Sequence, residues 1–427
     1  MRRFRFDEPG FQAAFAAFTE ERRETPQDVD AVVREVVEAV RGEGLAALLR
    51  FAREFDKVEL DEATLRVTAD EIEAGAAACP AEVREAIAFA AGRIRAYHDR
   101  QRPQDHWFKD DAGVELGWRW TPLEAVGIYV PGGRAAYPST VLMNAVPAAA
   151  AGVERIAMVT PPGRLQPAVL AAAKAAGVTE IWRVGGAQAV AALAFGAGPI
   201  RPVDKIVGPG NAYVTAAKRQ VYGVVGIDAL AGPSEIVVVA DGANNPEWIA
   251  ADLLSQAEHD PAAQAILITD DAAFAAKVEA AVTAQLGTLS TGEDAAASWR
   301  DHGAVIIAPL DEAPALVNRI APEHVEFAMD APERLSDQVR HAGAIFLGRH
   351  APEAIGDYVA GSNHVLPTSR AARFSSGLSL YDFLKRTSIV KCDEAAFARL
   401  APATVALAEA EGLPAHARSA AIRMGQN

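Results

Sequence analysis

Short runs of β-branched residues alternate with alanine-rich stretches through the middle of the chain, and this rhythm constrains the fold more than any other feature. In a first block we expect strands at 125–130, 156–160, 181–184 and 205–207, with helices at 139–151, 167–176 and 187–195. In a second block we expect strands at 236–239, 265–269, 304–308 and 344–347. Such alternation is typical of parallel strands covered by helices. The sequence therefore predicts an α/β fold with two Rossmann-like α/β units and mostly parallel sheets.

Helices are expected on both sides of these units. Six valines recur at helical spacing after Thr25-Pro26, a typical helix start, and Gly42 and Gly44 would end this helix; the valines are Val29, Val32, Val33, Val36, Val37 and Val40. A second helix is expected from Pro80 to Tyr97. The chain after Tyr381 also looks helical, with a break at 412–414. We therefore expect an N-terminal helical region at 1–120, a first α/β unit at 121–235, a second at 236–380 and a helical tail at 381–427.

Charge and composition exclude several classes of partner. The 427 residues include 41 Lys and Arg against 56 Asp and Glu, a net charge of −15, which argues against nucleic-acid binding and against anionic membranes. Neither a secretory signal nor an apolar run of about 20 residues is present, so we expect a soluble, cytoplasmic protein. Cys79 and Cys392 lie far apart and are interpreted as bystanders, without a disulfide.

Glycine-containing turns follow three of the expected strands, at 130–133, 184–188 and 207–211. In open α/β sheets ligands bind at the carboxyl ends of strands, where glycine lets backbone N–H groups approach a phosphate. Taken alone, each turn is better explained as an ordinary strand-to-helix connection, and none has the dinucleotide-binding or P-loop spacing of glycines. Three such turns in one sheet favour a shared ligand.

Polar residues of the second half suggest a metal. Asp252, Gln256 and His259 share one face of a helix expected between Asn245-Pro246 and Asp260-Pro261, where Gln256 and His259 could both reach one ion or simply form an exposed polar face. Asp357 and His364 bracket a loop that contains glycine, and Glu411 and His416 flank the break in the tail. Ordinary loop polarity and a helix end would explain these four residues as well. Nitrogen and oxygen donors without a thiolate suit zinc or another borderline divalent metal.

Glu323 and His324 are adjacent, and we place them in a loop at a strand end, where both could address one pocket. A carboxylate and an imidazole, with ordinary pKa values of about 4.3 and about 6.5, offer two proton acceptors of different basicity. A polar turn is the alternative interpretation.

Seven stretches of the chain resemble the histidinol dehydrogenase family, and the resemblance runs from about residue 20 to the C-terminus. They are GIYVPGG (127–133), GGAQA (185–189), KIVGPGN (205–211), AGPSE (231–235), DLLSQAEH (252–259), PEH (322–324) and GSNHVLPT (361–368). The resemblance implies an NAD-dependent zinc enzyme that oxidises L-histidinol through L-histidinal to L-histidine.

The same resemblance implies roles for individual residues. One zinc ion per subunit would be held by Gln256, His259, Asp357 and His416, and Glu323 and His324 would be the catalytic pair. Ser234, His364 and Glu411 would contact the substrate together with His324 and the zinc ligands. Tyr129, Gln188 and Asn211 would contact NAD. The family forms homodimers whose tail crosses to the partner, so Glu411 and His416 would serve the other subunit's site.

The chemistry of these residues fits the implied reaction. Oxidation of an alcohol to an acid needs a base for the hydroxyl proton, which suits His324, and then an activated water, which suits Glu323. Zinc would hold the imidazole and amine of the substrate in a fixed pose. Two alternatives remain open: a related enzyme acting on another small alcohol, such as a sulfonated diol, and a zinc-dependent hydrolase in which Glu323 activates a metal-bound water. His364 and Glu411 favour histidinol.

Overall fold

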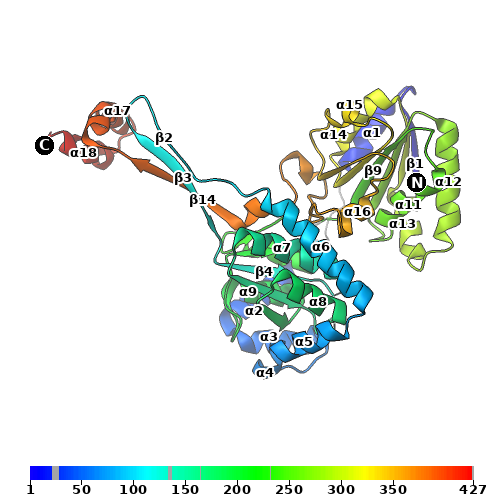
Figure 1. Ribbon diagram of the computed structural model, residues 1–427, viewed down its shortest axis with the longest axis horizontal. Coiled ribbons are helices and arrows are strands. Elements are labelled where there is room, and N and C mark those ends of the chain that lie inside the picture. Colours follow the sequence, from blue (N-terminus) through cyan, green and yellow to red (C-terminus); the bar gives the residue numbers. More distant parts are fainter. Residues whose placement is uncertain (22–27, 133–136, 164, 231, 426–427) are drawn as a thin grey trace. The chain divides into compact units, whose positions relative to one another are not determined.

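The computed structural model describes residues 1–21, 28–132, 137–163, 165–230 and 232–425. The chain divides into a main unit, residues 1–100 with 124–383, and a small unit, residues 101–123 with 384–427 (Figure 1). The expected helix start at Thr25-Pro26, Gly133 and Ala231 lie outside the described residues.

The first sheet of the main unit is parallel and five-stranded, in the order β6-β5-β4-β7-β8. Its strands are β4 (Ala125–Tyr129), β5 (Arg155–Thr160), β6 (Glu180–Arg183), β7 (Lys205–Val207) and β8 (Gly226–Ile227), connected by α7 (Pro138–Ala151), α8 (Pro167–Ala176), α9 (Gly186–Phe195) and α10 (Ala212–Val221). All five residues of β4 are buried, as expected for a parallel strand covered on both faces. The strand order reverses between β4 and β7, and ligands bind at such a point in open sheets.

The second sheet of the main unit is also parallel and has six strands, in the order β1-β11-β10-β9-β12-β13. They are β1 (Arg2–Arg5), β9 (Glu235–Ala240), β10 (Gln264–Thr269), β11 (Ala304–Ile307), β12 (His324–Ala328) and β13 (Ala344–Leu347). The helices include α1 (Phe11–Glu20), α11 (Pro246–Ala257), α12 (Ala272–Leu286), α13 (Gly292–His302), α14 (Ala313–Ile320), α15 (Glu333–Ser336) and α16 (Glu353–Tyr358). The two parallel sheets confirm the predicted α/β fold.

Two strands of the second sheet were not expected from the sequence. The helical prediction for the N-terminal region is wrong at Arg2–Arg5, which forms β1 and pairs with β11, about 300 residues later in the chain. The loop predicted at Glu323-His324 is wrong at its second residue, because His324 begins β12, between β9 and β13. Both residues of the pair therefore lie at the amino end of a strand.

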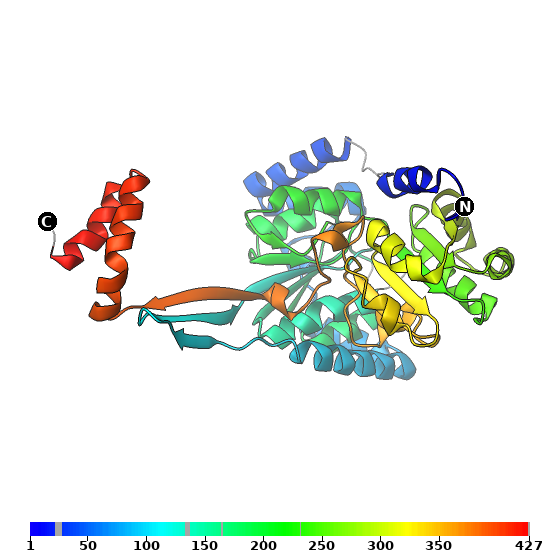
Figure 2. The ribbon, with the colours of Figure 1, turned by 90° about the horizontal axis from the view of Figure 1, so that it is seen from above.

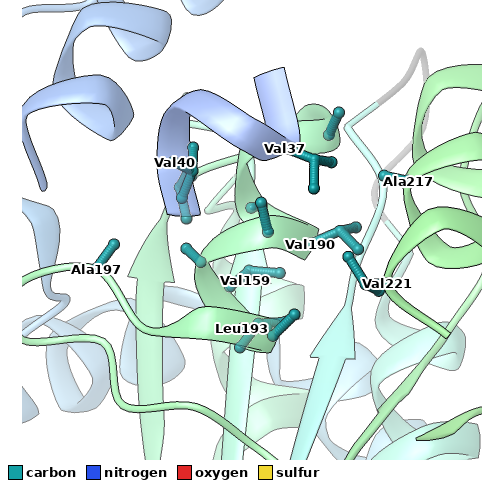
Figure 3. Close-up of a cluster of buried hydrophobic side chains, with 14 of the residues drawn as sticks. Val37, Val40, Val159, Val190, Leu193, Ala197, Ala217 and Val221 are labelled. Carbon is teal, nitrogen blue, oxygen red and sulfur yellow. The ribbon is translucent and has the colours of Figure 1, made fainter. Parts of the chain in front are cut away.

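The N-terminal helices pack on the helices that cover the first sheet. They are α2 (Asp28–Glu43), α3 (Leu45–Phe51), α4 (Glu62–Leu65), α5 (Ala69–Ala78) and α6 (Ala81–Asp99), with a short π-helical turn, η1 (Ala52–Asp56). Val37 and Val40 of α2 pack over Val190 and Leu193 of α9 (Figure 3). Among the six valines only Val32 is exposed, by 45%.

The small unit contains an antiparallel sheet, β14-β3-β2, formed by β2 (His106–Lys109), β3 (Glu115–Pro122) and β14 (Leu384–Lys391). The chain then continues through α17 (Glu394–Ala410) and α18 (Pro414–Ala421) (Figure 1 and Figure 2). The helical prediction after Tyr381 therefore holds from Glu394 onward and is wrong for Leu384–Lys391, all of which pairs with β3. No helix in the described ranges has both the length and the apolar character needed to cross a membrane.

Candidate functional site

A pocket of about 230 Å³ in the main unit brings together most of the predicted site residues. The first sheet contributes Gly208, Pro209 and Asp228, which follow β7 and β8 at the carboxyl ends of those strands. From the second sheet come the predicted residues Ser234, His259, Glu323 and His324, which precede or begin its strands at the amino ends. Two more predicted residues line the pocket and follow β13 in the chain, Asp357 on α16 and His364 in the loop after it. The pocket thus lies at the carboxyl ends of strands in the first sheet and at the amino ends of strands in the second sheet.

His324 is buried and surrounded by carboxylates. Its Nδ1 atom lies 3.1 Å from the carbonyl oxygen of Glu235, and because a carbonyl only accepts, Nδ1 carries the proton. Its Nε2 atom has no hydrogen-bond partner within the described chain and lies 3.7 Å from Asp357 Oδ1 and 3.9 Å from Glu353 Oε1. Burial lowers the pKa of His324, but the carboxylates of Glu323, Asp357 and Glu353 outweigh it and raise that pKa to about 10.

Glu323 lies beside His324 with little exposure to solvent. Glu323 Oε2 accepts a hydrogen bond of 3.1 Å from the Glu235 amide and lies 3.8 Å from His324 Nδ1. Burial raises the pKa of Glu323 to about 7, although the neighbouring imidazole opposes this shift. A carboxylate with a pKa near neutrality can take a proton from water and release it again.

The raised pKa of Glu323 makes stability depend on pH. The folded state holds the proton more tightly than the unfolded state, where the pKa is near 4.5, so this contribution to stability is complete below 4.5 and is lost as the pH rises through 7. A Glu323→Gln variant has no titrating group at this position and does not lose this stability. In metal-free protein, we expect the free energy of unfolding of the parent chain to fall by about 3 kcal/mol more than that of the variant between pH 4 and pH 8. Denaturant titrations at the two pH values measure this difference, and parallel pH profiles would contradict it.

Gln256 and His259 lie side by side, as predicted for two ligands of one metal ion, and the part of Asp357 in that site stays a prediction. Asn245 caps the start of α11 by accepting from the Glu247 amide at 2.9 Å, and the predicted helix places Gln256 Nε2 and His259 Nδ1 3.1 Å apart near its end. Gln256 is fully buried, and its Oε1 atom lacks a hydrogen-bond partner among the residues described. An acceptor left unpaired in the interior is costly, and a bound cation would remove this cost.

The charges of this group also suit a cation. The neighbouring His324 lowers the pKa of Asp357 to about 2 against the opposing effect of burial, so its carboxylate is ionised. Burial lowers the pKa of His259 and of His364, which keeps both imidazoles neutral and able to donate a lone pair. His364 Nδ1 lies 3.0 Å from the carbonyl oxygen of Asp357.

Sequence reasoning missed a buried carboxylate, Glu353, behind His324. Its side chain lies within 4.8 Å of the donor atoms of His324 and Asp357, accepts from Ser255 Oγ at 3.0 Å, and has a pKa that burial and Asp357 raise to about 8. Glu353 and Asp357 are four residues apart on α16, a spacing that places them on one helix face. The i, i+4 spacing of Glu353 and Asp357 was the sequence signal that could have identified Glu353. Asp252, on the face of Gln256 and His259, contacts Glu326 instead of the predicted metal group.

A second cavity, of about 560 Å³, contains all three residues predicted to contact NAD. Tyr129 is buried, and its hydroxyl accepts a hydrogen bond of 3.0 Å from the Gly186 amide at the start of α9. Gln188 Nε2 donates to Asp56 Oδ2 at 3.4 Å, and Asn211 caps α10 by accepting from two amides at 3.1 Å.

The walls of this cavity are suited to an aromatic ligand. Phe55 and Tyr213 line it and are 49% and 48% exposed, and the exposed Val32 of α2 adds an apolar surface. Flat aromatic faces of this kind can stack on a base. The cavity therefore offers both stacking surfaces and polar groups to a nucleotide.

Glu411 and His416 belong to the small unit, where both are exposed around the turn between α17 and α18. Their predicted part in the pocket of the main unit stays a prediction. The two cysteines are free, Cys79 buried and Cys392 exposed, as their interpretation as bystanders requires.

Comparison with known proteins identifies relatives along the whole chain. A family model for histidinol dehydrogenase matches residues 19–424. The histidinol dehydrogenases of Caulobacter vibrioides and Rhodospirillum rubrum are 80% and 60% identical to the chain, and the matches cover 99% and 97% of each sequence. The crystal structure of histidinol dehydrogenase from Elizabethkingia anophelis is 36% identical, covers 100% of this chain and 98% of its own, and superposes with a TM-score of 0.94.

Proposed function

Because the chain belongs to the histidinol dehydrogenase family, a family of oxidoreductases, we propose that it oxidises L-histidinol through L-histidinal to L-histidine with NAD, the last steps of histidine biosynthesis. The observation that carries the proposal is the buried pair Glu323 and His324, two proton acceptors of different basicity, facing one pocket beside the metal donors. The comparisons support this reaction and neither the diol nor the hydrolase alternative.

His324 acts in the first oxidation. Because its Nδ1 atom donates to the Glu235 carbonyl, Nε2 is the atom that accepts the proton of the substrate hydroxyl. This requires a neutral imidazole, whereas the surrounding carboxylates hold the pKa of His324 near 10. Asp357 is a proposed ligand of the metal, and a divalent cation held there would offset the field of the carboxylates and lower the pKa of His324 toward the working range.

Glu323 acts in the second oxidation. An aldehyde carries no hydroxyl to oxidise until water adds to its carbonyl carbon, so one water molecule must lose a proton at this stage. Glu323 faces the same pocket as His324 and has a pKa near neutrality, which suits it to accept that proton. His324 then accepts the hydroxyl proton of the hydrate, as it does from the alcohol.

Gln256, His259 and Asp357, with His416 of the partner subunit, are the proposed zinc ligands, one ion per subunit. The unpaired Gln256 Oε1 and the nearby imidazole and carboxylate support this assignment. When bound, zinc holds the imidazole and the amine of the substrate and so fixes the reacting carbon. Ser234 and His364 line the same pocket and are proposed to contact the substrate, together with Glu411 of the partner subunit.

Removal of the metal tests this assignment. A site without thiolates and with a neutral Gln ligand binds zinc less tightly than a cysteine-rich site, so chelator should abolish activity and leave the fold intact. Activity should return when zinc is added, and acid should release the metal as the imidazoles protonate. The measurements are metal content, circular dichroism and NADH formation on one sample. Full activity in a protein verified to be metal-free would contradict a catalytic metal.

The cavity that contains Tyr129, Gln188 and Asn211 is the proposed site of NAD, which accepts the hydride in each oxidation. The adjoining β7–α10 loop, residues 208–211, supports this assignment, because it lines both this cavity and the catalytic pocket. We place the enzyme in the cytoplasm, in keeping with two cysteines that form no disulfide.

We also propose a homodimer with shared active sites. The small unit exposes large apolar side chains, among them Val390 at 65%, Leu407 at 66% and Ile422 at 51%, whereas its described buried residues are mostly alanines. Large apolar side chains that are exposed while the interior is built of alanine favour a surface that a partner covers. A second copy of the chain would cover it and would receive Glu411 and His416 in its own site.

The experiment that tests the function counts NADH formed from L-histidinol. If both oxidations occur at one site, each histidinol consumed should yield two NADH with little free histidinal. A ratio of one, with accumulating aldehyde, would contradict the two-step reaction. Absence of NADH from histidinol would contradict the proposed substrate.

A further inference from the structure

A buried ion pair between Lys218 and Asp228 lines the catalytic pocket and has no part in the chemistry above. Lys218 lies on α10, Asp228 follows β8, and their side chains are only 3% and 5% exposed. Together they bind the carbonyl and the amide of one residue, Gly208. Lys218 Nζ donates to the Gly208 carbonyl oxygen at 3.0 Å, and the Gly208 amide donates to Asp228 Oδ2 at 2.7 Å.

The backbone of Gly208 has little freedom to move, because both of its polar groups are hydrogen-bonded and its surroundings are tight. Its φ angle is +109°, and a Cβ atom at this position would lie 2.3 Å from the carbonyl oxygen of Tyr129. Only glycine fits against the end of β4 in this conformation. The ion pair therefore fixes a backbone position that also touches a residue of the NAD cavity.

The loop that Gly208 begins contributes to both cavities. Gly208 and Pro209 line the catalytic pocket with Glu323 and His324, whereas Asn211 lines the NAD cavity with Tyr129 and Gln188. Hydride transfer requires the reacting atoms to be about 3–3.5 Å apart, and a misplacement of about 1 Å can lower the rate about 100-fold. The position of the 208–211 loop therefore influences how coenzyme and substrate meet.

We propose that Lys218 and Asp228 are positioning residues, which hold the 208–211 loop between coenzyme and substrate for both hydride transfers. The inference rests on the proposed function. A buried ion pair is often no more stabilising than an apolar pair of the same shape, so stability alone does not explain why the interior keeps these charges. The two hydrogen bonds that these side chains make to Gly208 explain why the charges are kept.

A charge-balanced double variant separates positioning from stability. In Lys218→Met/Asp228→Asn no charge is left buried without a partner, and the Asn side chain can still accept from the Gly208 amide. The variant loses the donor to the Gly208 carbonyl and the ion pair between the two side chains. We expect a melting temperature near that of the parent chain, kcat lowered on the order of 10–100-fold for both oxidations, and a KM for histidinol within about twofold. The deuterium isotope effect on kcat should rise, because hydride transfer becomes slower.

A second readout needs neither coenzyme nor substrate. Hydrogen exchange of the peptide that contains residues 208–211 should be faster in the double variant. The matched control is Arg155→Met/Glu180→Gln, a partly buried pair at 3.1 Å and 14% and 8% exposure, which lies at the amino ends of β5 and β6 in the same sheet. This control should keep both kcat and the exchange rate of the loop.

The outcomes distinguish the inference from the function on which it rests. If the parent chain reduces NAD with histidinol and the folded double variant keeps its kcat and its loop protection, the positioning role is wrong and the function stands. An equal loss of kcat in the control pair would also overturn it. If the parent chain forms no NADH from histidinol, the proposed function fails and the inference fails with it.

Discussion

Glu323→Gln is expected to slow the oxidation of L-histidinal by about 100- to 10,000-fold, the usual range for loss of a general base, while L-histidinol is still oxidised to the aldehyde. Only the aldehyde step needs an activated water, and the proton of the alcohol goes to His324. Separate assays with histidinol and histidinal as substrates measure the two rates. Free histidinal should accumulate when the variant is given histidinol.

Glu180→Gln is the matched control for this experiment, because Glu180 and Glu323 are buried to nearly the same degree, at 7% and 6% exposure. Glu180 lies in the first sheet and lines neither cavity, so both rates should stay near those of the parent chain. Equal losses of the alcohol and aldehyde rates in Glu323→Gln would show that Glu323 has another role.

Mixing two inactive variants is expected to restore activity. His416→Ala lacks a proposed zinc ligand and Glu323→Gln lacks the proposed water base, so each homodimer should oxidise L-histidinal at almost no rate. When the two are refolded together in equal amounts, about half the dimers are hybrids by random pairing. If the tail crosses, one site in each hybrid combines an intact Glu323 with an intact His416 from the other subunit. The rate of L-histidinal oxidation should then recover to about a quarter of the parent value.

The control for the mixing experiment is a pair of variants whose substitutions both lie in the main unit. Glu323→Gln mixed with His324→Ala places both defects in the main unit, so no hybrid contains a repaired site. That mixture should stay as inactive as its components, whichever way the tail folds. If the His416→Ala mixture is equally inactive, with hybrids demonstrated by a size or affinity tag, His416 acts within its own subunit.

Much of the main unit could be predicted because its elements are buried on both faces. The strands around β4 and β9 are continuous apolar runs, and the helices between them are rich in alanine, so local composition alone identifies them. The exposed strand β14, with the sequence LKRTSIVK, has no such signal. Its strand conformation depends on β3, and β1 likewise depends on β11, so both reflect pairing across long stretches of chain.

The candidate site could be predicted in part. Local spacing placed Gln256 next to His259, and Ser234, Glu323, His324, Asp357 and His364 do meet in one pocket. The sequence could not indicate that the second sheet presents the amino ends of its strands, because that orientation depends on packing between elements far apart in the chain. For the same reason Lys218 and Asp228, ten residues apart across a helix and a strand, were not recognised as a pair.

The small unit is formed by two segments that lie far apart in the chain, 101–123 and 384–427, so it cannot be completed until the second segment has been synthesised. At synthesis rates of roughly 5–20 residues per second, β3 leaves the ribosome on the order of 10–50 seconds before its partner β14. Until then β3 has only the four-residue β2 beside it, and a lone two-stranded hairpin is marginally stable. The nascent chain therefore exposes an unpaired edge of β3 throughout this interval, and such an edge can pair with a strand of another chain.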